Sequence, residues 1–78
     1  MNEELLGKKL KEMYDEGKVK KETATKVHLF GIRYSNELKR NDISIAKVIE
    51  ISGIPLSYAV EVNKGKNLAK YVLVKESV

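Results

Sequence analysis

The chain has 78 residues, of which 42% are hydrophobic and 33% are charged, and it contains no cysteine. This length allows one small domain, and the lack of cysteine excludes both a disulfide framework and a thiolate zinc site. The 15 Lys and Arg residues outnumber the 11 Asp and Glu residues, and the resulting net charge of +4 is compatible with nucleic-acid binding without establishing it.

The first predicted element is a helix over residues 2–16. Leu6, Leu10 and Met13 are spaced by four and three residues, which places them on one face of a helix. Gly17 follows, and glycine readily adopts the left-handed conformation that ends many helices. The sequence therefore predicts that the first helix stops at Gly17.

A second, central helix is predicted over residues 22–40. Its apolar residues cover most of the helix circumference, which is typical of a buried helix. They are Val27, Leu29, Phe30, Ile32, Tyr34 and Leu38. Gly31 in the middle costs roughly 1 kcal/mol relative to alanine, a loss that predicts a close crossing of another helix backbone at this position.

Two shorter helices are predicted over residues 44–52 and 56–64. Ser44 can cap the first of them, and Gly53 ends it. Pro55 is tolerated in the first turn of a helix but not in its interior, so the next helix begins at about this point. The predicted fold is thus mostly α, a bundle of about four helices in a single domain over residues 1–78.

The end of the chain is the one place where extended structure is expected. Residues 70–75 are rich in Tyr and Val, which are common in strands. The segment is expected to form either a short strand or an extended tail.

A short helix, a glycine turn and a second helix are the parts of a helix-turn-helix, and residues 44–65 supply them in that order. The stretch resembles the motif of the lactose-repressor family and of lambda-repressor-like proteins. The agreeing positions are Ser44, Val48, Gly53, Ile54, Val62 and Gly65. Two positions differ: Ile49 stands where these motifs usually carry alanine, and Pro55 replaces the Ser or Thr that caps their recognition helix.

The resemblance implies that the second helix of the motif enters the major groove of double-stranded DNA. The base-reading positions of the family correspond to Leu56, Ser57 and Glu61. Tyr58 lies beside a lysine cluster and can stack or donate a hydrogen bond. The predicted DNA-binding residues are Ser57, Tyr58 and Glu61 near the bases, and Lys64, Lys66 and Lys70 on the phosphates. These residues predict a regulatory or accessory DNA-binding protein. Its small size also predicts a homodimer, because a second copy can complete a small core.

Leu56 and Val60 favour an alternative function. They are four residues apart and form an apolar strip if the other face of their helix is buried. In this alternative the chain is a helix-turn-helix-like interaction module that does not read DNA sequence. Its partner would be a protein, such as a nuclease subunit or a restriction, phage or defence component.

Catalysis and membrane insertion are not expected. His28 is the only histidine and has no cysteine with which to share a metal, and Asp15 and Glu16 are neighbours that point apart on a helix. No stretch approaches the ~20 apolar residues of a membrane span, and the acidic start does not resemble a signal peptide. We therefore predict a cytoplasmic protein without enzymatic activity, metal or cofactor.

Overall fold

The computed structural model describes residues 1–75, and all regular structure in this range is helical. The elements are α1 (Glu3–Lys20), α2 (Thr23–Arg33), α3 (Ser35–Leu38), α4 (Ile45–Ser52), the 3-10 turn η1 (Leu56–Tyr58) and α5 (Ala59–Leu68). The predicted mostly α bundle is therefore confirmed. No helix within residues 1–75 combines the length and the apolar character needed to cross a membrane.

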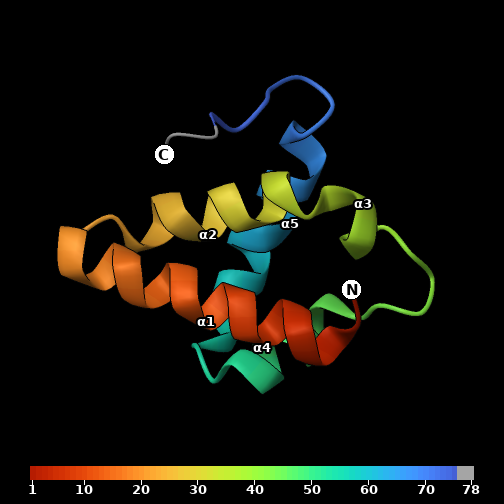
Figure 1. The fold of residues 1–78 in the computed structure, drawn as a ribbon, viewed down its shortest axis with the longest axis horizontal. Coiled ribbons are helices and arrows are strands. Elements are labelled where there is room, and N and C mark those ends of the chain that lie inside the picture. The colour runs from red at the N-terminus through yellow and green to blue at the C-terminus, as the bar shows by residue number, and fades with distance from the viewer. Residues whose placement is uncertain (76–78) are drawn as a thin grey trace.

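The packing order of the helices is α4, α1, α2 and α5 (Figure 1). Helix α1 packs against both α2 and α4, and α5 lies across α2. The side chains buried between them come from α1, α2, α3, α4, the turn after α4, and α5. They are Leu6, Leu10, Val27, Phe30, Leu38, Val48, Ile49, Ile54 and Val62. One shared core therefore holds all the long helices in place.

Helix α1 is longer than the sequence predicted, and its expected end at Gly17 is wrong. Asn2 caps its start by accepting a hydrogen bond from the Leu5 amide at 2.9 Å. Gly17 is buried inside the helix, where an added Cβ would lie 2.8 Å from Thr23 Cα. The residue that ends α1 in the left-handed backbone conformation is Lys21, with φ of 59°. Gly17 thus allows a close approach between α1 and the start of α2, and it does not end the helix.

The single helix predicted over residues 22–40 is broken at Tyr34, which has φ of −106° and ψ of 24°. The break separates α2 from the short α3. Phe30 and Leu38 are nevertheless both buried. The apolar spacing therefore predicted the buried face correctly but could not show the break, because the break leaves the apolar stripe continuous.

The helix-turn-helix consists of α4, the turn at Gly53, and η1 with α5. Ser44 Oγ accepts a hydrogen bond from the Lys47 amide at 3.3 Å, so Ser44 caps α4 as predicted. Gly53 has φ of 77°, a left-handed conformation that favours glycine, and it ends α4. Pro55 precedes a 3-10 turn, and the helix after it continues to Leu68, beyond the predicted end at residue 64.

Residues 70–75 contain no strand, so only the extended-tail expectation agrees with the structure. Tyr71 still belongs to a turn that follows α5, and its amide donates a hydrogen bond to the Leu68 carbonyl at 2.9 Å. The tail borders a hollow over α2 and α3 through Val72, Leu73 and Val74. The tail therefore runs beside α2 and α3, with Leu73 itself 94% exposed.

The close crossing predicted from Gly31 is confirmed, and the second helix is α5. A Cβ added to Gly31 would lie 2.9 Å from Lys66 N and 3.0 Å from Gly65 Cα. A Cβ added to Gly65 would lie 3.0 Å from Gly31 Cα. The two glycines therefore allow α2 and α5 to touch backbone to backbone, which fixes one face of α5 against the bundle and leaves the opposite face outside.

Candidate nucleic-acid interface

The exposed face of α5 and of the turn before it lies opposite the crossing with α2. Leu56 and Val60 are 66% and 55% exposed. Further along the same face are the exposed polar and basic residues Ser57, Asn63, Lys64 and Asn67. Their spacing of three and four residues makes one continuous stripe on the helix. The second helix of the motif is thus accessible to a ligand along its length.

Two of the predicted DNA-binding residues are directed toward other helices. Tyr58 packs edge-on against Tyr14 of α1, with the ring centroids 5.4 Å apart and the ring planes at 81°. Glu61 Oε2 lies 2.5 Å from His28 Nε2 of α2. Both residues therefore contribute to holding η1 and α5 against the bundle.

The Glu61 side chain is only 25% exposed, and its histidine partner is 34% exposed. His28 Nε2 is enclosed and makes no hydrogen bond of acceptable geometry within residues 1–75, despite the short distance to the carboxylate. The contact is thus an ion pair when the imidazole is protonated. One carboxylate oxygen of Glu61 is therefore directed toward α2.

The lysines predicted to bind phosphate are not equivalent. Lys64 and Lys70 are exposed, whereas Lys66 is half-buried. Lys64 and Lys70 border one open hollow together with Asn67 and Tyr71. The Lys70 Nζ lies 5.3 Å from the centroid of the Tyr71 ring, a cation–π distance. The accessible positive charge therefore extends from the middle of α5 to the residues just after it.

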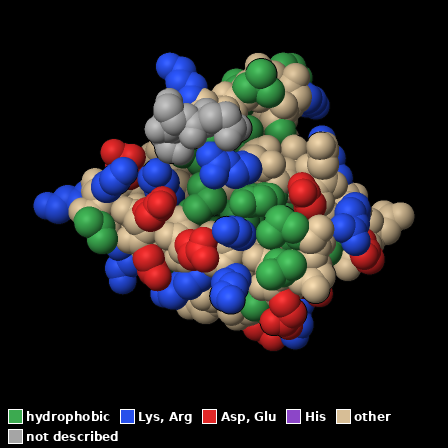
Figure 2. All heavy atoms as spheres, viewed as in Figure 1, with side chains coloured by type: hydrophobic (Ala, Val, Ile, Leu, Met, Phe, Trp, Pro, Cys, Tyr) green, Lys and Arg blue, Asp and Glu red, His purple; other side chains and the backbone are tan. Residues whose placement is uncertain are grey.

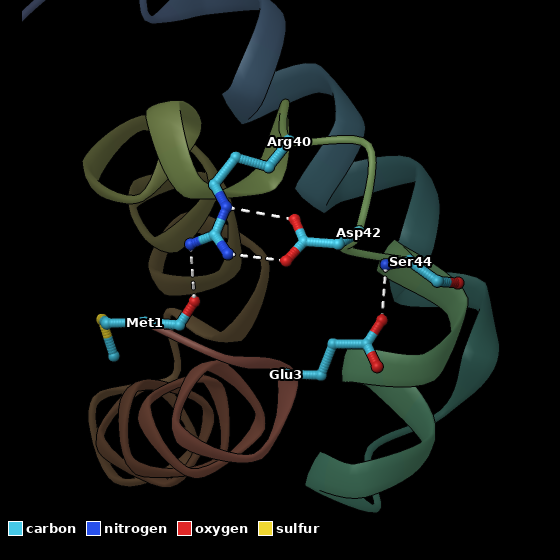
Figure 3. Close-up of polar contacts among 5 residues, drawn as sticks. All are labelled: Met1, Glu3, Arg40, Asp42 and Ser44. Atoms are coloured by element: carbon cyan, nitrogen blue, oxygen red, sulfur yellow. Dashed lines mark hydrogen bonds and ion pairs between the residues drawn. The ribbon is translucent and has the colours of Figure 1, made fainter.

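Helix α4 adds little free positive charge. Lys47 Nζ lies 3.0 Å from Glu50 Oε1, and this hydrogen bond raises the pKa of the Lys47 ammonium above its ordinary value. The Ser44 amide at the start of α4 donates to Glu3 Oε2 at 2.6 Å (Figure 3). A phosphate approaching this end of α4 would meet the Glu3 carboxylate, so the start of α4 is a poor phosphate site.

A second contact in Figure 3 fixes the loop before α4. The Arg40 guanidinium donates to both carboxylate oxygens of Asp42, at 3.1 and 2.7 Å, and to the Met1 carbonyl at 3.0 Å. The hydrogen bond from Arg40 holds the pKa of the Asp42 carboxyl below its ordinary value. These contacts join the loop to the start of the chain, and the Asp42 carboxylate compensates the charge of Arg40.

The opposite side of the molecule, over α1 and α2, is mixed in charge (Figure 2). Hydrophobic side chains gather near the centre of this face, with Lys, Arg, Asp and Glu side chains around them. Lys9 and Lys20 border a hollow here together with Glu12 and Glu16. Because positive and negative groups alternate, this face attracts a polyanion less than a purely basic surface would.

Residues 2–75 match a family model described as an HTH-like domain. The chain belongs to this family of HTH-like domains. No curated protein and no solved structure matches the chain. The match extends well beyond residues 44–65, so the HTH-like domain includes α1 and α2 as well as the helix-turn-helix.

The sequence prediction missed two residues on the exposed face of this HTH-like domain, Asn63 and Asn67. Asparagine side chains carry both a donor and an acceptor and can pair with adenine in the major groove. Asn63 Nδ2 donates to the Ala59 carbonyl at 3.2 Å, and this hydrogen bond does not involve Oδ1 of Asn63. The spacing of three and seven residues from Val60 would have revealed both, once Val62 and Gly65 were assigned to the buried face.

Proposed function

We propose that this HTH-like domain binds double-stranded DNA through the exposed face of α5, as a regulatory or accessory factor. The main support is the stripe of polar and basic side chains on a helix whose opposite face is fixed to α2 by the Gly31–Gly65 crossing. An α-helix of this kind fits the major groove. In a homodimer, two such helices would read half-sites separated by about 34 Å, one helical turn of DNA.

The side chains of the stripe divide into two roles. Ser57, Asn63 and Asn67 offer hydrogen-bonding groups that can distinguish base edges. Lys64 and Lys70, with Lys66 behind them, contact phosphates and fix the register of the helix. Tyr58 and Glu61 keep α5 in position through their contacts with Tyr14 and His28.

The two exposed lysines provide the first prediction. We expect Lys64→Ala/Lys70→Ala to make the dependence of log affinity on log salt less steep, by roughly 2 in the magnitude of the slope, because each phosphate contact contributes about 0.9. The measurement is a titration of labelled random duplex DNA at several salt concentrations between about 50 and 200 mM. The variant should remain folded, since both side chains are exposed.

The matched control is Lys9→Ala/Lys20→Ala, which removes the same charge from the hollow over α1 and α2. This control should bind with nearly the wild-type slope. Absence of wild-type binding at about 50 mM salt would contradict the proposed function. Equal losses in the two variants would show that net charge, and not the α5 face, determines binding.

The exposed Leu56 and Val60 support a second candidate function, the docking of a protein partner. Leu56 borders a groove between α4 and η1 that is lined in part by Ala46, Ile49 and Ile54, and Val60 lies one helical turn after Leu56. An apolar strip that continues into an apolar groove is typical of a protein-binding surface. This candidate needs no base reading by α5.

Leu56→Asp distinguishes the two candidates. If α5 enters the major groove, the added carboxylate faces phosphates, and we expect weaker DNA binding with an unchanged oligomeric state by light scattering. If the strip docks a protein or a second copy, the variant loses that association and keeps its affinity for DNA. Leu73→Asp adds the same charge at a residue that is 94% exposed in the tail and serves as the control.

A further inference from the structure

A tyrosine on α1 lies between two lysines and the start of the recognition helix. Lys11 Nζ and Lys18 Nζ each lie 5.7 Å from the centroid of the Tyr14 ring. This distance is within the range of cation–π attraction, which holds an ammonium group without neutralising it. Tyr14 also packs edge-on against Tyr58 of η1. The aromatic pair therefore joins a basic edge of α1 to the turn that begins the second helix of the motif.

The same edge of α1 also adjoins α4. Lys11 borders a hollow together with Ile51 and Ser52, which lie at the end of α4. Gly7, one helical turn earlier, approaches Ile51 so closely that an added Cβ would lie 2.9 Å from Ile51 Cβ. This edge of α1 therefore lies beside both helices of the helix-turn-helix.

The charges of the two lysines differ in availability. Lys11 Nζ lies 3.1 Å from Asp15 Oδ1, so its charge is compensated. Lys18 forms no ion pair with any residue in the range 1–75, and it is exposed. The Tyr14 ring limits the positions of the Lys18 ammonium while leaving its charge free for an anion.

We propose that Lys18, positioned by Tyr14, contacts the DNA phosphate backbone beside the start of α5. Lys64 and Lys70 gather charge near the other end of this helix. The DNA backbone is then held on both sides of the point where α5 enters the groove, and the orientation of the helix is fixed by two separated contacts. This inference rests on the proposed DNA-binding function and extends the interface to α1.

Removal of the Lys18 charge tests the contact. For Lys18→Ala we expect the magnitude of the slope of log affinity against log salt to decrease by about 0.9. The ratio of wild-type to variant affinity should therefore shrink by about 3.5-fold between 50 and 200 mM salt. Lys20→Ala is the matched control, because Lys20 lies in the same last turn of α1 but borders the hollow over α1 and α2. The control should keep the wild-type slope.

Asp15→Asn gives a test with the opposite sign. The substitution releases Lys11 from its ion pair and removes a negative charge from the same edge. We expect tighter DNA binding and a steeper salt dependence, by about 0.9 in the slope. Glu16→Gln, which removes the same charge from the hollow over α1 and α2, should not produce this gain. A general effect of net charge would raise the affinity of both variants equally.

Failure of this inference is distinguishable from failure of the proposed function. If wild type binds duplex DNA, Lys64→Ala/Lys70→Ala weakens it and Lys18→Ala does not, the α5 interface stands and the α1 contact is excluded. If wild type does not bind duplex DNA at about 50 mM salt, both proposals fail. If Lys20→Ala matches Lys18→Ala, the effect comes from net charge and the contact at Lys18 is excluded.

Discussion

Replacement of Gly65 by alanine should lower the free energy of unfolding by about 2 kcal/mol, although alanine is the better helix former. A Cβ at residue 65 would meet the His28 carbonyl and lie 3.0 Å from Gly31 Cα. These are backbone atoms, which cannot rotate away as the end of a side chain can. The helices would have to separate, and the core between α2 and α5 would loosen. Urea denaturation followed by circular dichroism measures the change.

The sign of the effect makes this prediction discriminating. In an open helix, a change from glycine to alanine stabilises by up to about 1 kcal/mol. Asn67→Ala, on the exposed face of the same helix, is the control and should not destabilise the fold. Gly31→Ala should resemble Gly65→Ala, and the double variant should cost less than the sum because both separate the same helices. A stabilised Gly65→Ala variant would show that the crossing is not close.

Burial was predictable from the sequence because it is a property of a whole helix face. Val27, Phe30 and Leu38 lie in the core, as their spacing requires. The break at Tyr34 was not predictable in this way. One residue outside the helical conformation does not change which side of the segment carries the apolar residues. Apolar spacing thus predicted the core of this HTH-like domain better than its helix boundaries.

Glycine is ambiguous in a sequence because it serves two physical needs. Gly53 provides the left-handed conformation of the turn, with φ of 77°. Gly17 and Gly31 instead provide space for another backbone. The two needs look alike in a local sequence, so Gly17 was assigned to a helix end that Lys21 forms with φ of 59°. Gly31 was interpreted correctly because apolar residues continue on both sides of it, and the cost of glycine inside a helix pointed to a close crossing.

The candidate site was only partly predictable, because the orientation of α5 is set by helices distant in the sequence. Exposure of Leu56 and Val60 followed from the expected burial of Val62, and the structure shows it. The partners of Tyr58 and Glu61, which are Tyr14 and His28, belong to α1 and α2. No local pattern in residues 44–65 indicates either contact. The positioning of α5 is therefore a property of the whole domain, in agreement with a family match over residues 2–75.

The largest departure from the motif of the repressors, Ile49 in place of alanine, should be costly to reverse. Ile49 is 1% exposed and belongs to the core together with Val48 and Ile54. We expect Ile49→Ala to lower the free energy of unfolding by about 2 to 4 kcal/mol, because it removes buried methyl groups and leaves a cavity. Thermal and urea unfolding measure the loss.

Ile49→Val removes one methylene group and should cost only about 0.5 to 1.5 kcal/mol. Leu56→Ala truncates a side chain that is 66% exposed, so it should change the stability less than Ile49→Ala does. A cost near zero for Ile49→Ala would mean that α4 and α5 can close to the spacing that alanine allows. Since Ile49 also borders the groove beside Leu56, its volume helps to set the position of η1 relative to α4. DNA affinity of Ile49→Ala should therefore fall even under conditions in which the variant is fully folded.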